Sequence, residues 1–308
     1  MQVRRDLNGQ KSFLRKKTQC CAIKIKPIEV LSPSSQLSPV VFASPHSGKH
    51  YPEDFLKTTN LSPHQLRLSE DAFVDQLFDT ANEYGAPLLK AHFPRAFVDP
   101  NREAFELDPQ MFNTILPKYV KSESPRVRSG LGTIARIVAN GIEIYNEQLC
   151  FKEVKKRIEQ NYYPYHTQLA ALIEATRLKF GACLLVDCHS MPSLGGAGDT
   201  NSRRNRMDIV LGDLHGTSCS PIITDLAYST LKDLGYSVTF NKPYAGGYTT
   251  KQYGRPNDGV HSLQIEINRA LYMDEVKIAP LPSFSKLKTD IAKLVAALTS
   301  INPDQLTS

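Results

Sequence analysis

A continuous apolar run in the second half of the chain constrains the fold more than any other feature. Residues 182–187 read Ala-Cys-Leu-Leu-Val-Asp, without the alternation of polar and apolar residues that marks a strand with one face in water. Such runs are typical of central strands in sheets that helices cover on both faces. The sequence therefore predicts an α/β layer fold with a largely parallel, pure or mixed sheet.

Strand patterns alternate with helical patterns along the rest of the chain, as an α/β fold requires. We expect strands at 40–43, 87–91, 96–99, 182–187, 207–212, 236–240 and 260–267. We expect helices over about 70–84, over 142–180 with an interruption near Tyr163-Pro164, from Ser220-Pro221 onward, and along the C-terminal stretch that contains Leu287, Ile291 and Leu294.

The basic excess of the chain lies at its N-terminal end. The net charge is +6, and residues 1–38 contain eight Lys or Arg against two acids, so the other residues are neutral as a set. A polyanion-binding enzyme would carry its positive field on the folded body, so we expect no nucleic-acid partner. We expect a basic, disordered leader over 1–38 and a single α/β domain over 39–302.

Cysteine usage and hydropathy indicate the compartment. None of the six cysteines forms a CxxC pair, and no apolar run approaches the ~20 residues that span a bilayer. The first residues also lack a signal-peptide pattern. We therefore expect a soluble, cytoplasmic protein with no membrane partner.

Two histidines follow two predicted strands at the point where each strand ends. His46 comes shortly after 40–43, and His189 comes directly after 182–187. Ligands in open α/β sheets gather beyond the carboxyl ends of the strands. Zn²⁺ binds imidazole and carboxylate groups, and in catalytic sites it keeps a position open for water. The two histidines therefore indicate a zinc site.

The third ligand of such a site should be a carboxylate. Glu70 and Asp71 stand at the start of the helix predicted after the His46 loop, where acids also stabilise the helix dipole. Asp187 is an alternative ligand, because side chains two apart on a strand point the same way. It would otherwise orient His189 through a hydrogen bond behind the metal.

Seven short motifs occur in the order found in N-formylglutamate amidohydrolases. They are Ser44-Pro-His-Ser-Gly48, Ser69-Glu-Asp71 with Val74-Asp75, Val98-Asp-Pro-Asn-Arg102, Asp187-Cys-His-Ser190, Gly246-Gly-Tyr248, Tyr253-Gly-Arg-Pro256 and Gln264-Ile-Glu266. The chain resembles that family from about residue 40 to 277. The family is similar to zinc carboxypeptidases and aspartoacylases, so the resemblance implies a three-layer α/β/α sandwich with a mixed, largely parallel sheet and one zinc ion.

The resemblance also implies roles for the residues of the metal site. His46 and His189 would bind Zn²⁺ or another divalent metal, and Glu266 would take the proton from the attacking water. The residue three after His46 is Lys49, where the carboxypeptidase pattern has glutamate. The carboxylate ligand must then come from elsewhere, with Asp71 the first choice and Glu70 the second.

Other matching residues would bind the substrate. Asn101 and Arg102 resemble the pair that holds a substrate's terminal carboxylate, and a guanidinium suits this task because it offers parallel donors. Arg95 would polarise the scissile carbonyl. The remaining candidates are Arg136 and Arg255 for a second carboxylate, Gly247 for close backbone approach, and Tyr248 for a hydrogen bond to the substrate.

The activity that the resemblance implies is hydrolysis of N-formyl-L-glutamate to formate and L-glutamate, a reaction of histidine degradation. More generally, the partner would be a small N-acyl amino acid, and the enzyme a zinc-dependent amidohydrolase acting on linear amides. Two alternatives keep the metal: an aspartoacylase-like deacylase, and a small zinc carboxypeptidase or amidase. A third alternative is a catalytically inactive protein that binds a small molecule.

Overall fold

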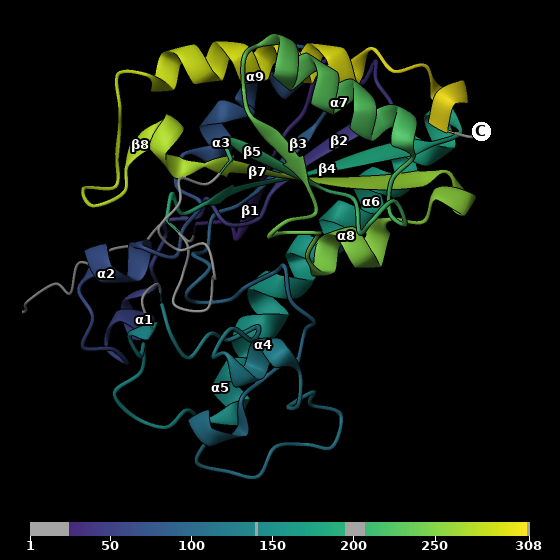
Figure 1. Ribbon diagram of the computed structural model, residues 1–308. Helices are drawn as coiled ribbons and strands as arrows, with labels where there is room; N and C mark the ends of the chain where they lie inside the picture. Colours follow the sequence, from purple (N-terminus) through teal and green to yellow (C-terminus); the bar gives the residue numbers. More distant parts are fainter. Residues whose placement is uncertain (1–24, 139–140, 195–206, 307–308) are drawn as a thin grey trace, which may run out of the picture.

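A mixed sheet of seven strands forms the centre of the computed structural model, which describes residues 25–138, 141–194 and 207–306 (Figure 1). The strand order is β1-β3-β2-β4-β7-β5-β6. The four middle strands are mutually parallel, whereas β1 and β5 run antiparallel to their inner neighbours. The strands are β1 Ile28–Leu31, β2 Val40–Ser44, β3 Leu88–Ala91, β4 Cys183–Met191, β5 Ile209–Gly212, β6 Val238–Phe240 and β7 Val260–Asn268.

Helices cover both faces of this sheet. α7 and α9 lie above it in Figure 1, and α6 and α8 lie below it. The two faces carry separate apolar clusters, with Phe42 and Val186 in one, and Val41 and Leu185 in the other. The expected three-layer α/β/α sandwich is therefore confirmed. The helices are α1 Glu53–Leu56, α2 Pro63–Arg67, α3 Val74–Leu77, α4 Pro125–Arg128, α5 Phe151–Arg157, α6 Tyr163–Phe180, α7 Pro221–Asp233, α8 Tyr248–Tyr253 and α9 Phe284–Thr299.

Shorter elements complete the structure. β8 (Met273–Asp274) and β9 (Ala279–Pro280) form a separate antiparallel pair. The remaining short helical turns include η1 Asp79–Asn82, η2 Pro109–Met111, η5 Pro256–Asp258, η6 Arg269–Leu271 and η7 Pro303–Leu306.

Strand β4 confirms that the apolar run forms a central strand. All nine of its residues are buried, and it pairs in parallel with β2 on one side and β7 on the other. A strand covered on both faces needs no polar residues until it reaches the edge of the sheet. At its carboxyl end β4 carries His189, opposite Glu266 of β7 in the register.

Two elements near the site differ from the expected ones in the described structure. The helix predicted over 70–84 reduces to α3 and η1, because Phe73 takes a left-handed conformation (φ 68°) and the Asp71 N–H donates to His46 O rather than within a helix. The strand predicted at 96–99 is a turn, in which the Phe97 and Val98 N–H groups both donate to Pro94 O. In both segments, the loop conformation around the site overrides the helix or strand that the sequence pattern predicts.

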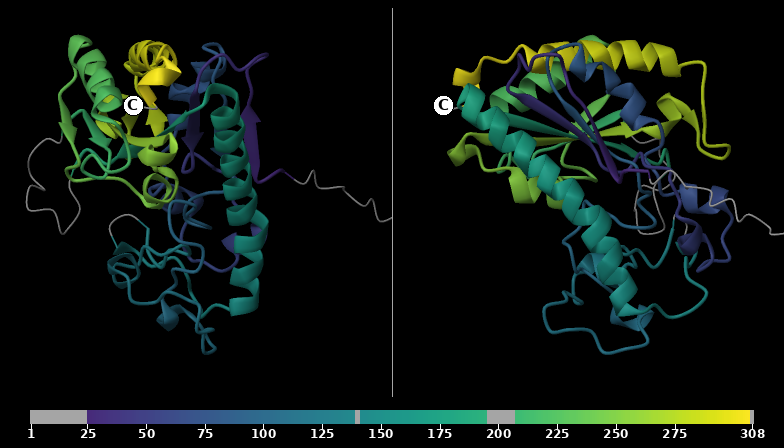
Figure 2. Two further views of the ribbon diagram at one scale, coloured as in Figure 1. Left: turned by 90° about the vertical axis from the view of Figure 1, so that its right-hand side faces the viewer. Right: turned by 180° about the vertical axis from the view of Figure 1, so that it is seen from behind.

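The helix predicted over 142–180 begins later, at Phe151, where α5 starts. It continues through the π-helical segment η4 (Ile158–Tyr162) into α6, so the expected interruption near Tyr163-Pro164 takes the form of a widened turn. Figure 2 shows this long helix running from the lower loops up along one face of the sheet.

The expected boundary at residue 38 lies too far along the chain. β1 (Ile28–Leu31) pairs antiparallel with β3 and forms one edge of the sheet. Residues 25–37 are therefore part of the described fold. Residues 1–24 lie outside the described residues, and the leader stays a prediction for them.

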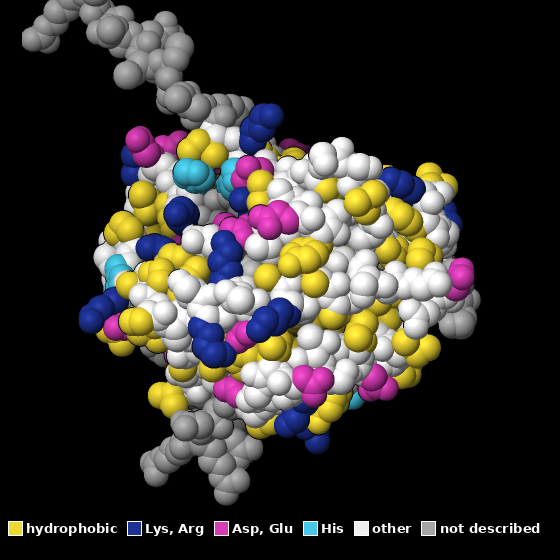
Figure 3. All heavy atoms as spheres, turned by 90° about the horizontal axis from the view of Figure 1, so that it is seen from above, with side chains coloured by type: hydrophobic (Ala, Val, Ile, Leu, Met, Phe, Trp, Pro, Cys, Tyr) yellow, Lys and Arg dark blue, Asp and Glu magenta, His cyan; other side chains and the backbone are white. Residues whose placement is uncertain are grey.

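Charged residues of both signs occur on the face formed by α7 and α9, which Figure 3 shows from above. On α9, Asp290 pairs with Lys286 and Lys293, at N···O distances of 2.6 and 3.1 Å. Within the described residues, no helix is both long enough and apolar enough to cross a membrane.

Truncating Leu185 should test the central position of β4. Leu185→Ala is expected to lower the free energy of unfolding by about 2–5 kcal/mol, because it leaves a cavity in the fully buried cluster beneath the sheet. Leu178→Ala is the matched control, since that leucine on α6 is 73% exposed and should change stability by less than about 0.5 kcal/mol. Urea unfolding measures both; similar losses would contradict the assigned layers.

Candidate metal and substrate site

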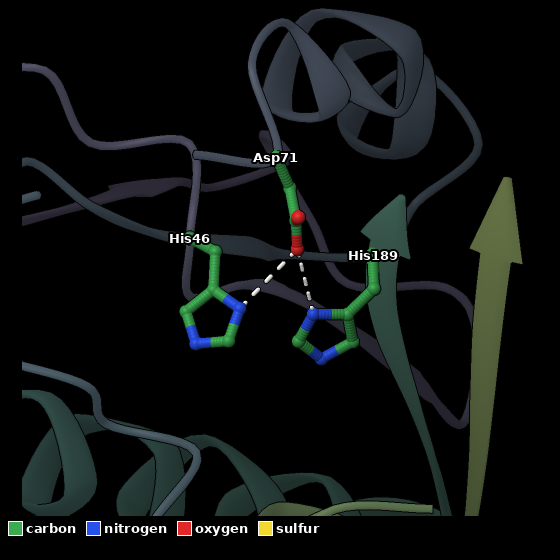
Figure 4. A group of neighbouring side chains, drawn as sticks. All are labelled: His46, Asp71 and His189. Atoms are coloured by element: carbon green, nitrogen blue, oxygen red, sulfur yellow. Dashed lines mark hydrogen bonds and ion pairs between the residues drawn. The ribbon is translucent and has the colours of Figure 1, made fainter. Parts of the chain in front are cut away.

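Three buried side chains from distant parts of the chain meet beyond the carboxyl ends of β2 and β4. His46, Asp71 and His189 each offer one ligand atom, and these atoms all lie within 4.8 Å of one another. Asp71 Oδ2 is 3.2 Å from His46 Nδ1 and 3.0 Å from His189 Nδ1. Figure 4 shows the carboxylate between the two imidazoles. The structure thus brings together the three residues favoured as metal ligands.

The loop after β2 is fixed by hydrogen bonds to the Asp71 segment. The Ser47 hydroxyl donates to Asp71 O (2.9 Å) and accepts from the Asp75 N–H (3.1 Å). Gly48 allows the loop to pack closely, because a Cβ at this position would lie 2.1 Å from Phe93 O. The Ser-Pro-His-Ser-Gly motif therefore encodes the position of His46 as well as its identity.

A second carboxylate lies behind each imidazole. His46 Nε2 is 2.7 Å from Asp99 Oδ1, and His189 Nε2 is 3.0 Å from Asp187 Oδ2. Each carboxylate accepts the Nε2 proton, which leaves Nδ1 as the atom that faces Asp71. The structure thus places Asp187 behind His189, in the orienting position considered for it. Sequence reasoning assigned no such role to Asp99, although it lies in the matching Val-Asp-Pro-Asn-Arg motif.

The charges at this centre suit a cation. Burial opposes ionisation of Asp71, but hydrogen bonds from His189 and His46 hold its pKa well below the ordinary value. Burial alone would lower the pKa of His189, but Asp187, Asp71 and Glu266 together raise it well above the ordinary value. With both Nε2 atoms donating, each Nδ1 needs a proton or a metal ion between it and the carboxylate. The donor set therefore fits a divalent metal ion.

Arg269 completes the support of Asp71, and sequence reasoning missed it. Its Nη2 donates to Asp71 Oδ1 (3.1 Å), its Nε to Ser190 Oγ (3.2 Å) and its Nη1 to Leu68 O (3.2 Å). This leaves Oδ2 as the carboxylate oxygen directed at the imidazoles. The only sequence signal for Arg269 was its position just after the strand that carries Glu266.

Glu266 lies beside the cluster of His46, Asp71 and His189. It is buried, lines the same cavity, and stands opposite His189 in the β4–β7 register. Gln264 Nε2 donates to its Oε1 at 2.9 Å. Burial is the main cause that raises its pKa, with Asp71 and Asp187 adding to the rise and His189 and Arg95 opposing it, to about 7. A carboxylate of this kind is suited to exchange protons near neutral pH.

Arg95 and Arg102 share Asp99. Arg95 Nε donates to Asp99 Oδ2 at 3.0 Å, and Arg102 Nη2 lies 3.7 Å from the same oxygen. Arg102 also donates to Leu131 O and Asn101 O, at 2.8 and 2.7 Å. Both guanidiniums line the cavity that contains Glu266.

Asn101 is held on both ends of its side-chain amide. Its Oδ1 accepts from the Thr249 N–H (2.8 Å), and its Nδ2 donates to Asp187 Oδ2 (3.4 Å), 3.1 Å from His189 Nε2. A Cβ on Gly247 would lie 2.4 Å from this amide. Both residues line the cavity, and their contacts tie the start of α8 to the carboxylate behind His189.

The other candidates lie elsewhere. Glu70 accepts from Tyr51 and Arg67 and is not part of the cluster that Asp71 joins. Tyr248 packs near His166, with the ring centroids 5.6 Å apart. Arg136 pairs with Asp108 and Glu143, and Arg255 pairs with Asp258. The residues that line the cavity do not include Glu70, Arg136, Tyr248 and Arg255.

The cavity has a volume of about 990 Å³, at the upper end of the range for small-molecule sites. Its polar lining includes His46, Asp71, Arg95, Asp99, Asn101, Arg102, Arg126, His189, Gln264, Glu266 and Arg269. The His46–Asp71–His189 cluster, Glu266 and four arginines thus share one space large enough for an amino acid derivative.

A half-buried histidine, His166, supports the 99–102 segment. His166 Nε2 lies 2.8 Å from Pro100 O, and its Nδ1 lies 2.9 Å from the Tyr253 hydroxyl. Burial lowers the pKa of His166 from 6.5 to about 4, while the bond to Pro100 opposes that shift. His166 therefore joins α6 and α8 to the loop that bears Asp99 and Arg102.

This pKa shift predicts a pH dependence of stability. Between pH 6.5 and about 4, the unfolded chain binds a proton at His166 that the folded chain does not, so stability falls as the pH drops through this window. His166→Asn should make that fall shallower in urea unfolding. The exposed His64 provides the control, and His64→Asn should leave the slope unchanged. An unaltered slope in the His166 variant would refute the assignment.

Metal binding should depend on Asp71 and not on its neighbour. Asp71→Asn is expected to weaken divalent metal binding by about 100-fold or more, because the shared anionic oxygen is lost. Glu70→Gln is the matched control and should bind as the unmodified protein does, since its carboxylate pairs with Tyr51 and Arg67. Metal analysis after dialysis measures both; the reverse order of losses would place the ligand at Glu70.

Comparison with known proteins gives a consistent result. The family model described as N-formylglutamate amidohydrolase matches residues 38–273. Proteins named N-formylglutamate deformylase from Pseudomonas putida and Pseudomonas aeruginosa are 27% and 28% identical to this chain over 258 residues. The alignments cover 81% and 80% of this chain and 87% and 86% of the relatives.

A solved structure of N-formylglutamate amidohydrolase from Ralstonia eutropha is similar over most of the fold. It is 36% identical, with a TM-score of 0.85, and the match covers 91% of this chain and 100% of that chain. The resemblance inferred from seven short motifs is thus confirmed over both sequence and structure. The chain belongs to the N-formylglutamate amidohydrolase family.

Proposed function

We propose that this protein hydrolyses N-formyl-L-glutamate with one water molecule, giving formate and L-glutamate. Its membership of the amidohydrolase family and its similarity to the Pseudomonas N-formylglutamate deformylases support this substrate. The cavity supports it as well, because cationic side chains line the space beside the metal-ligating residues.

The observation that carries the proposal is the position of Glu266. It faces the same cavity as His46, Asp71 and His189, and adjacent parallel strands hold it in register with His189. Hydrolysis of an amide requires a base for the attacking water and an acid for the leaving nitrogen. Glu266 accepts the proton from water and returns it to the amine, so the carboxylate is regenerated.

His46, Asp71 and His189 would hold one Zn²⁺ ion, because two imidazole nitrogens and a carboxylate oxygen match the ligands of catalytic zinc. When bound, the metal supplies a Lewis acid that polarises a carbonyl oxygen and acidifies water. Asp99 and Asp187 accept the Nε2 protons, so both Nδ1 atoms face Asp71 and would be available to the ion.

Two arginines position the substrate and stabilise its charge. The Arg95 guanidinium lies close enough to Glu266 to lower its pKa, so it stands beside the reacting carbonyl and stabilises the developing negative oxygen. Arg102 binds the α-carboxylate: its Nε and Nη1 are held by backbone carbonyls, which fixes the guanidinium, while Nη2 keeps donor capacity. Asn101 orients Asp187 and the start of α8.

Replacing Glu266 tests the proposed base. The unmodified protein should release glutamate from N-formylglutamate and lose this activity with a chelator. Glu266→Gln should lower kcat by roughly 10²–10⁴-fold, because the amide cannot accept the proton, while metal content stays unchanged. Formate release and metal analysis on the same samples measure both quantities.

N-acetyl amino acids and dipeptides serve as control substrates, because a deacylase or a carboxypeptidase would cleave them. The proposal predicts that these are poor substrates. Efficient hydrolysis of an N-acetyl or peptidyl substrate with no release of glutamate from N-formylglutamate would reject it, and full activity of Glu266→Gln would reject the assigned base.

A further inference from the structure

Four arginines line the cavity, and three of them have acidic partners there. Arg95 and Arg102 lie at Asp99, and Arg269 donates to Asp71. Arg126 is the fourth, and it forms no ion pair or hydrogen bond through its side chain within the described parts of the chain. A guanidinium without an acidic partner on the wall of a binding cavity is available to an anionic ligand.

The backbone places Arg126 beside Arg102. Leu131 N donates to Arg126 O at 2.8 Å, and Leu131 O accepts from Arg102 Nε at 2.8 Å. The Ser124 hydroxyl accepts from Val127 N, and the buried Val127 side chain anchors the short helix α4. Leu131 thus links the Arg126 backbone to the Arg102 guanidinium, so both residues belong to the same wall.

Electrostatics supports this proximity. Burial is the main cause that lowers the pKa of Arg102 to about 10, and the positive charges of Arg95 and Arg126 add to that shift. The acids that line the cavity are Asp71, Asp99 and Glu266, and all three belong to the cluster around the metal-ligating histidines. Arg126 therefore adds a positive charge, without an acidic partner among the described residues, to the wall where Arg102 lies at Asp99.

The rest of that wall is apolar. Leu131, Ala135, Ile137 and Val138 line the cavity in the segment that follows Arg126. Apolar neighbours suit the methylene groups of an amino acid side chain. This combination matches an aliphatic side chain that ends in a carboxylate.

We propose that Arg126 binds the side-chain carboxylate of the substrate and so selects acidic N-formyl amino acids over neutral ones. This inference rests on the proposed function, in which Arg102 binds the α-carboxylate. It replaces Arg136 and Arg255 as the residue for the second carboxylate, since acids outside the cavity engage both of those. Arg126 is then a specificity-determining residue, with no part in proton transfer.

The test compares N-formylglutamate with its neutral isostere N-formylglutamine. Arg126→Gln should lower kcat/KM for N-formylglutamate by about tenfold, mainly through KM, and change that for N-formylglutamine by less than about twofold. Arg126→Lys keeps the charge without the fork of donors and should give an intermediate loss. The control is Arg128→Gln, because Arg128 lies on the same helix but does not line the cavity. Equal losses for both substrates, or no loss, would overturn the inference.

Calorimetric binding separates this inference from the proposed function. In a Glu266→Gln background, N-formylglutamate should bind more tightly than N-formylglutamine, and Arg126→Gln should abolish the difference. If the unmodified protein releases no glutamate but this binding pattern holds, the hydrolytic function fails and the role of Arg126 stands. If hydrolysis occurs and the preference survives Arg126→Gln, the role of Arg126 fails and the function stands.

Discussion

The direction of two imidazole rings is the constraint on which the site depends. Buried carboxylates accept the Nε2 protons of His46 and His189, so both Nδ1 atoms face one oxygen of Asp71. Burying the Asp71 carboxylate beside two imidazole nitrogens costs free energy unless a proton or a cation lies between them. The surrounding protein therefore fixes which nitrogen of each histidine faces Asp71, and a cation at this centre would meet the two Nδ1 atoms.

The His46 loop, His189 and Glu266 meet because the middle strands of the sheet are parallel. β2, β4 and β7 end at the same edge, which brings the His46 loop, His189 and Glu266 together across a large separation in sequence. The segments that carry Asp71 and Asp99 form hydrogen bonds to other loops instead of regular helix or strand bonds. The Asp71 N–H donates to His46 O, and the Asp99 N–H donates to Thr133 O. The short helix α3 and the turn before Asp99 are the local result.

Sequence patterns were sufficient for the groups that sit on strands or directly after them. A buried strand has few polar residues, so His189 and Glu266 stand out from the apolar background, and Asp71 was favoured by resemblance. The choice between Asp71 and Glu70 needs the tertiary structure, because adjacent side chains diverge and only one reaches the histidines. Asp99 and Arg269 act through His46 and Asp71, so no local pattern reveals them. Arg136 pairs with Asp108, which lies 28 residues earlier in the sequence.

Anomalous diffraction from crystals grown with Zn²⁺ tests this metal site, because it locates the metal and its bonded atoms together. We expect one zinc ion per chain at about 2.0–2.1 Å from Nδ1 of both His46 and His189 and from Oδ2 of Asp71. Coordination through Nε2, or zinc bound only at a place remote from these three residues, would contradict it.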